Sequence, residues 1–121
     1  MNFIPSALLE KLYTRKSLEN NATGFQFKIK NRLSNAQLTE VLSAKVGEKI
    51  ITPKEVSLDF GGGKVVDPQE IKEPIAFSLG QEFTVKVEGE ALAAGDYNVE
   101  LNFVTQPVGK LSLKIKDKIE E

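Results

Sequence analysis

The chain has 121 residues, which suffices for one hydrophobic core, and its net charge is −1 with 40% hydrophobic and 27% charged residues. This balance of charge argues against a nucleic-acid partner, because such proteins gain affinity from excess positive charge. The sequence also lacks an uninterrupted apolar stretch of the roughly 20 residues that a membrane-spanning helix needs. We therefore expect a globular protein with neither nucleic-acid nor membrane partners.

The sequence contains no histidine and no cysteine. Zinc sites, Ser-His-Asp triads, Cys-His dyads and disulfide frameworks all require one of these residues and are excluded. The carboxylates Asp59, Asp67, Glu70 and Glu73 are interleaved with lysines and match no calcium-binding loop. We expect no metal, no cofactor and no enzymatic activity from this chain on its own.

Residues 1–14 are expected to form an N-terminal arm with a short helix at residues 5–14. Pro5 suits the first helical turn, and Leu8, Leu9, Leu12 and Tyr13 follow at helical spacing. The opening residues contain no basic residue and do not resemble an export signal, so a cytoplasmic location is expected.

This arm has two interpretations. It can cap one end of the sheet core with its apolar stripe. Alternatively it can be an exposed arm that docks on a partner, because Phe3 and Ile4 add apolar area beyond what one short helix usually buries.

Residues 15–121 are expected to form a single β-sandwich domain, because apolar and polar residues alternate along most of this region. We expect about seven to nine short strands. They lie at residues 25–30, 56–60, 75–79, 82–88, 97–103 and 111–115, with a less regular strand at 36–46 and weaker candidates at 15–20, 50–51 and 64–66. The charged residues 116–121 are expected to be frayed.

The step Leu92-x-x-Gly95-x-Tyr97 resembles the tyrosine corner of immunoglobulin-like sandwiches. In that motif a tyrosine near the start of a strand donates its hydroxyl to upstream backbone. Gly95 and Tyr97 are therefore predicted to be structural residues. The expected fold class is all-β, an immunoglobulin-like antiparallel β-sandwich with a short N-terminal helix.

The loop at residues 31–35 is a second candidate for partner contact. Arginine is enriched at interface hot spots, and Arg32 stands beside the apolar Leu33 in this polar loop. The alternative is an ordinary connecting loop with Leu33 folded inward. Together with the arm, the loop gives a hypothetical partner-binding set of Phe3, Ile4, Leu9, Leu12, Tyr13, Arg32 and Leu33.

The pattern Gly24-Phe25-x-Phe27-x-Ile29-x-Asn31-Arg32, a hairpin near Gly47 and the late Leu92-x-x-Gly95-x-Tyr97 resemble the beta subunit of C-glycoside deglycosidases. That resemblance implies a β-sandwich that assembles with a larger barrel-shaped alpha subunit, which carries the metal and the catalytic residues. Residues 1–9 also resemble short proteins labelled hydroxymethylglutaryl-CoA reductase. That reductase family depends on a catalytic histidine, so reductase activity is not expected here.

The favoured function is a non-catalytic accessory or assembly subunit that binds and stabilises a larger catalytic chain, one acting on glycosides if the first resemblance holds. A carbohydrate-binding module is an alternative, although the chain has no tryptophan and only two tyrosines to stack on sugars. A self-associating protein that pairs through strand edges or through the arm is another.

Overall fold

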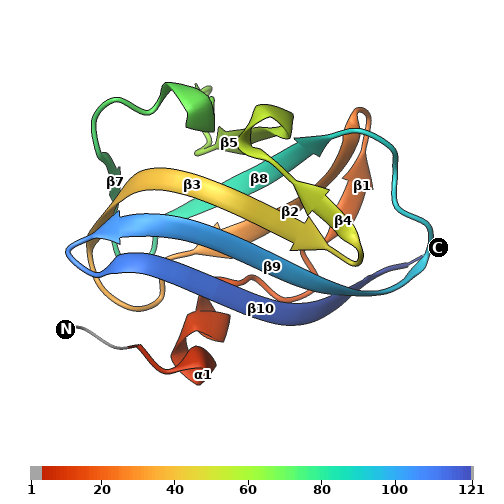
Figure 1. Cartoon of the computed structure of the whole chain (residues 1–121), viewed down its shortest axis with the longest axis horizontal. Coiled ribbons are helices and arrows are strands. Elements are labelled where there is room, and N and C mark those ends of the chain that lie inside the picture. Colours follow the sequence, from red (N-terminus) through yellow and green to blue (C-terminus); the bar gives the residue numbers. More distant parts are fainter. Residues whose placement is uncertain (1–3, 121) are drawn as a thin grey trace.

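Two antiparallel sheets pack face to face, and the computed structural model describes them within residues 4–120 (Figure 1). One sheet, here the β2–β8 sheet, has the order β1-β2-β8-β5-β6. The other, the β3–β9 sheet, has the order β10-β9-β3-β4, and β7 pairs with the opposite end of β3. The strands are β1 (Glu19–Asn21), β2 (Gly24–Lys30), β3 (Ala36–Val46), β4 (Lys49–Ile51), β5 (Val56–Asp59), β6 (Val65–Val66), β7 (Ile75–Phe77), β8 (Glu82–Glu88), β9 (Gly95–Gln106) and β10 (Gly109–Ile119).

This strand order is that of an immunoglobulin-like sandwich. The path β1-β2-β8-β5 corresponds to strands A, B, E and D of that fold, and β3-β9-β10 corresponds to C, F and G. The all-β, immunoglobulin-like prediction is therefore confirmed.

The core lies between the two sheets and is built from the inward positions of each strand. Alternation along β2 and β8 turns Phe27, Ile29, Phe83 and Val85 inward, and all four side chains are buried. The rings of Phe77 and Phe83 lie 5.1 Å apart between centroids, within the range of favourable aromatic contacts. Each such phenylalanine contributes about 1.5–3 kcal/mol by leaving water.

β3 departs from strict alternation because its pairing with β9 shifts register twice. The shifts lie between Leu38 and Glu40 and between Val41 and Ser43. Each bulge adds one residue to β3, so the inward side chains Leu38, Val41 and Ala44 are spaced by three residues instead of two.

The predicted tyrosine corner is present at the start of β9. The Tyr97 hydroxyl donates to the carbonyl oxygen of Ala93 at 2.7 Å. Gly95 has φ +144°, a conformation that residues with a side chain rarely adopt. Gly47, at φ +61°, lies so close to the Tyr97 ring that an added Cβ would stand 3.0 Å from it. Gly95 and Tyr97 therefore fix the entry into β9.

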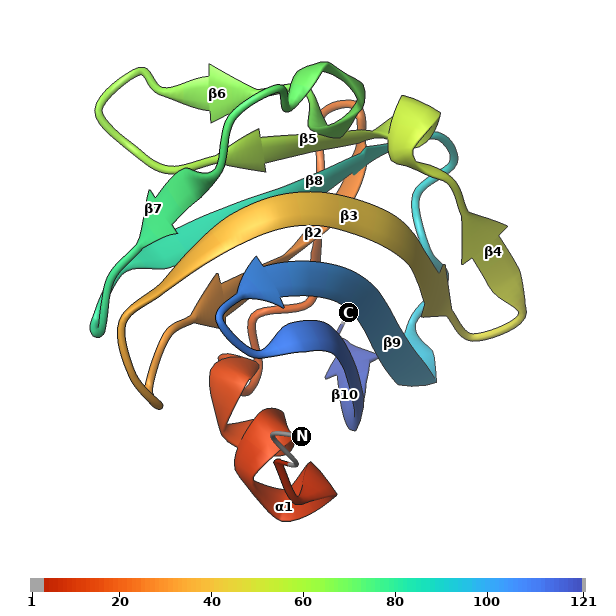
Figure 2. The same cartoon turned by 60° about the vertical axis from the view of Figure 1, so that its left-hand side comes forward.

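The N-terminal helix is shorter than predicted. α1 (Ser6–Leu9) continues as a 3-10 turn, η1 (Glu10–Leu12), and packs against β10, as Figure 2 shows. Tyr13 is then extended and forms an isolated bridge with Ile29, while the Thr14 N–H donates to the Lys28 carbonyl at 2.9 Å. Pairing with β2 therefore ends the helix at Leu12. The other 3-10 turns are η2 (Pro53–Glu55) and η3 (Pro68–Glu70).

Two further expectations are corrected. Residues 15–18 are not a strand, because Arg15 and Lys16 form a turn and β1 begins only at Glu19. The predicted fraying after residue 115 is wrong as well, since β10 pairs with β9 as far as Ile119 opposite Gly95 and the Ile119 side chain is buried. Within residues 4–120, no helical segment has the length and apolar character to cross a membrane.

Candidate partner-binding surface

The arm residues that were candidates for partner contact lie mostly in the core of the chain itself. Leu9, Leu12 and Tyr13 are only 9%, 2% and 2% exposed. Ile4 is half-buried against the same core, and Phe3 lies outside the described residues. The docking-arm hypothesis is thus corrected for Leu9, Leu12 and Tyr13, because the sandwich buries the apolar stripe that would have faced a partner.

Tyr13 also connects the arm to β10 through a hydrogen bond. Its hydroxyl donates to Asp117 Oδ2 at 2.7 Å, and the same oxygen accepts the Leu18 N–H at 3.1 Å. Burial, reinforced by the bond to Asp117, raises the pKa of the Tyr13 hydroxyl far above its usual value. Tyr13 therefore stays protonated and acts as a structural link between the two ends of the fold.

The 31–35 loop contacts the arm through Arg32. Its Nη1 donates to the Lys11 carbonyl at 2.7 Å and to the Tyr13 carbonyl at 3.4 Å, and its Nη2 donates to Thr14 Oγ1 at 3.3 Å. Leu33 is half-buried beside Ile4 at a cavity of about 30 Å³. The structure therefore brings the predicted arm and loop together, as a contact within the chain.

The residue that fixes this loop, Asn31, was not among the predicted site residues. Asn31 is buried, and its Nδ2 donates to the carbonyls of Ser34 and Phe77, each at 2.7 Å. Its Oδ1 accepts the Leu33 N–H at 3.1 Å. An asparagine that directly follows a regular strand was the available signal, since this residue commonly closes turns with its side chain.

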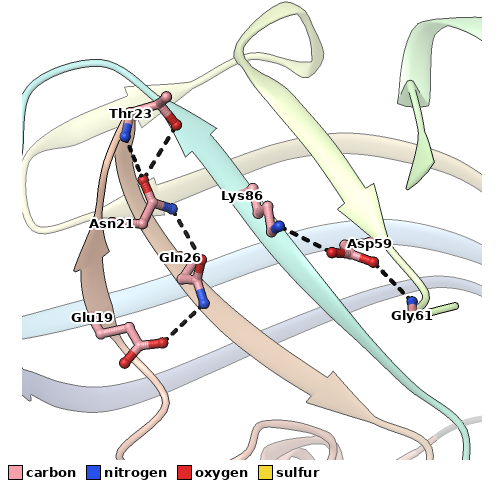
Figure 3. Close-up of polar contacts among 7 residues, drawn as sticks. All are labelled: Glu19, Asn21, Thr23, Gln26, Asp59, Gly61 and Lys86. Carbon is pink, nitrogen blue, oxygen red and sulfur yellow. Dashed lines mark hydrogen bonds and ion pairs between the residues drawn. The ribbon is translucent and has the colours of Figure 1, made fainter. Parts of the chain in front are cut away.

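The outer face of the β2–β8 sheet carries polar side chains that bind one another (Figure 3). Gln26 Nε2 donates to Glu19 Oε1 at 2.9 Å, and Asn21 Nδ2 donates to Gln26 Oε1 at 3.0 Å. Asn21 Oδ1 in turn accepts the Thr23 N–H at 2.9 Å. These groups form a continuous network across β1 and β2.

A second network on this face joins β8 to β5 (Figure 3). Lys86 Nζ lies 3.0 Å from Asp59 Oδ2, and the Gly61 N–H donates to Asp59 Oδ1 at 2.8 Å. The Gly61 hydrogen bond, followed by the bond to Lys86, lowers the pKa of the Asp59 carboxyl. Both Asp59 oxygens are therefore engaged inside the chain.

The outer face of the β3–β9 sheet has a different character at the end near the arm. Two adjoining grooves of about 610 and 560 Å³ share Arg15, Asn98 and Lys116. We call this surface the Arg15 groove. Its charged lining consists of Arg15, Lys16, Lys45, Lys114, Lys116 and Lys118 with Glu10, Asp96, Glu100 and Asp117.

Most cations of the Arg15 groove have no ion-pair partner. Lys114 lies 3.4 Å from Glu100 and Lys118 lies 3.6 Å from Glu120. Arg15, Lys45 and Lys116 have no carboxylate within 4.0 Å among residues 4–120. The groove therefore carries a surplus of positive charge, since its lining has six cations and four carboxylates.

Local backbone geometry places these cations. Alternation along β10 turns Lys114 and Lys116 outward. Lys16 holds the left-handed conformation, with φ +64°, in the turn that carries Arg15. Such a conformation is uncommon for a residue with a side chain and is found preferentially at functional sites.

In the described part of the chain, no group of three acidic, histidine or cysteine side chains is arranged to hold a metal ion. The chemistry that the geometry offers is the binding of negative charge in the Arg15 groove.

No curated protein matches the chain. The family model described as hydroxymethylglutaryl-CoA reductase, N-terminal domain, matches residues 8–120. This confirms the resemblance to proteins with that label, while the resemblance to deglycosidase beta subunits stays a prediction. Since the match spans nearly the whole sandwich, the chain belongs to the hydroxymethylglutaryl-CoA reductase N-terminal domain family.

Proposed function

We propose that this chain is a non-catalytic accessory domain that binds and stabilises a larger catalytic chain. The observation that carries the proposal is the Arg15 groove, where Arg15, Lys45 and Lys116 have no ionic partner among the described residues. Charges arranged in this way steer a partner of opposite charge and fix its orientation.

The family supports the same function. Its description names the N-terminal domain of an enzyme, which fits a chain that works beside a catalytic part. A protein interface of standard size buries about 800 Å² on each partner, and a sheet face with an adjoining groove can supply that area. The predicted resemblance to deglycosidase beta subunits favours a catalytic partner that acts on glycosides.

Self-association is a second candidate function, favoured by one observation. Ile50 lies on β4, at an edge of the β3–β9 sheet, and is 69% exposed. Exposed apolar residues on edge strands promote pairing with another chain. A carbohydrate-binding module is less well supported, because Tyr13 is buried and the Tyr97 hydroxyl binds Ala93.

The test is co-expression with the products of the neighbouring genes, followed by size-exclusion chromatography with light scattering of any enzyme found among them. We expect a stable complex and a higher melting temperature of the catalytic chain in it, because a partner that binds only the native state stabilises that state. A mixture that elutes as two separate proteins overturns the proposal. A dimer of this chain alone that Ile50→Lys dissociates would favour self-association instead.

A further inference from the structure

We propose that the Arg15 groove binds an extended acidic segment of a partner protein whose carboxylates occur at every second residue. This inference rests on the proposed accessory function and specifies the chemistry of the contact.

The spacing of the cations favours an extended segment. Lys114 and Lys116 lie two residues apart on one face of β10, which corresponds to about 6.7 Å along a strand. Alternate side chains of an extended peptide repeat at the same distance. Carboxylates at alternate positions can therefore approach both lysines in turn.

Across the strands β3, β9 and β10, a carboxylate on β9 separates a lysine on β3 from a lysine on β10. Glu100 pairs with Lys114 on one side and with Lys45 on the other in the β-sheet register. Lys45 and Lys114 are thus separated by two strand spacings, about 10 Å. A compact phosphate placed between them would lie against the Glu100 carboxylate, whereas separate carboxylates can bind on either side of it.

A nucleic acid fits this surface poorly. Glu10, Asp96 and Glu100 interrupt the positive charge, whereas a phosphate backbone requires a continuous basic footprint. The large apolar side chains exposed among residues 4–120 are aliphatic, so the described surface offers no aromatic platform for bases.

The experiment measures binding of synthetic peptides to the isolated ¹⁵N-labelled chain by NMR titration and calorimetry. One peptide has four glutamates separated by single serines, and a second has the same composition with its glutamates contiguous. We expect the alternating peptide to bind more tightly and to shift resonances of Arg15, Lys45 and Lys116. The affinity is expected to fall as salt rises from roughly 0.05 to 0.3 M, because screening weakens exposed charge pairs.

Two variants locate the contact. The double variant Arg15→Glu with Lys116→Glu is expected to weaken binding of the alternating peptide by about ten-fold or more, since it removes two attractive charge pairs and adds repulsion at both positions. Lys110→Glu is the matched control, because Lys110 lies on the same face of β10 outside the lining of the groove. The control variant is expected to bind like the original chain.

Several outcomes overturn the inference. Equal affinity for the two peptides rejects the alternating spacing, and equal loss in Lys110→Glu rejects the groove as the site. Inorganic phosphate that displaces the alternating peptide at comparable concentration points to a phosphate site instead. The peptide result is independent of the co-expression result. Peptide binding without a stable complex therefore refutes the accessory function alone, and a complex that survives the double variant refutes the groove alone.

Discussion

The two outer faces of the sandwich look alike in the sequence but differ in how their charges are used. On the β2–β8 face, Lys86 and Asp59 bind each other, and Gln26 binds Glu19 (Figure 3). On the β3–β9 face near the arm, Lys116 has no carboxylate partner among the described residues. On the first face Lys86 is paired within the chain, while Lys28 and Lys30 on the outer side of β2 make no ion pair among residues 4–120. On the second face Arg15, Lys45 and Lys116, which make no ion pair among the same residues, gather around one groove. The alternation of polar residues alone does not distinguish these cases.

The arm and the turn that follows it contribute to this difference, because Glu10 and Arg15 line the groove beside β10. The largest expected change in the free energy of unfolding comes from Leu12→Ala, which removes a buried side chain that anchors the arm. We expect a loss of about 2–5 kcal/mol in the free energy of unfolding. Urea unfolding measures this loss, and a change below about 1 kcal/mol would show that the arm is not part of the core.

The corner at the end of the groove gives a smaller effect. Tyr97→Phe removes the hydrogen bond to Ala93 while keeping the ring beside Gly47. We expect a loss of about 0.5–1.5 kcal/mol in unfolding free energy, the usual net value of one hydrogen bond. Thermal unfolding of the variant checks this value, and unchanged stability would mean that water replaces the lost bond at no cost.

A pH experiment tests whether Asp59, on the β2–β8 face, stabilises the fold through its bonds to Lys86 and Gly61. The folded state lowers the pKa of Asp59, so its contribution to stability is present above the unfolded pKa near 3.9 and is lost as pH falls through the folded value. Asp59→Asn is expected to lower stability at neutral pH by up to about 1 kcal/mol and to reduce the loss below about pH 4. The measurement is the free energy of unfolding of the original chain and of Asp59→Asn from roughly pH 2 to 7. If the two curves run parallel, the internal partners of Asp59 do not stabilise the fold.

The smallest effect on folding is expected from Lys116→Glu. Since Lys116 makes no ion pair among the described residues, the free energy of unfolding should change by less than about 0.5 kcal/mol. Lys86→Glu on the opposite face places a carboxylate against Asp59 and should cost more. Urea unfolding of the two variants compares the faces directly. Equal losses of unfolding free energy would show that the charges on the two faces contribute alike to stability.

Alternation predicted the strands well because it is a local consequence of burying one face of a sheet. The tyrosine corner could also be predicted from the sequence, since its residues are close together along the chain. The end of β10 was misjudged because Asp117 occupies an inward position between Ile115 and Ile119 and looks like an interruption. Only the folded chain brings Tyr13 and the Leu18 N–H to that carboxylate.

The same limit applies to the candidate site. An apolar stripe such as Leu9, Leu12 and Tyr13 shows that burial is needed, without showing which protein supplies the partner surface. The Arg15 groove was missed because its cations come from separated segments, namely the turn at Lys16, β3 and β10. Their shared location depends on the pairing of strands that are far apart along the chain.

The position of the arm against β10 has a consequence for solubility. β10 is the terminal strand of its sheet, and α1 and η1 pack against it (Figure 2). An uncovered strand of this length invites the backbone of a second molecule to add to the sheet. The arm therefore covers an edge at which further copies could extend the sheet. We expect a chain without residues 1–14 to aggregate more readily as its concentration rises.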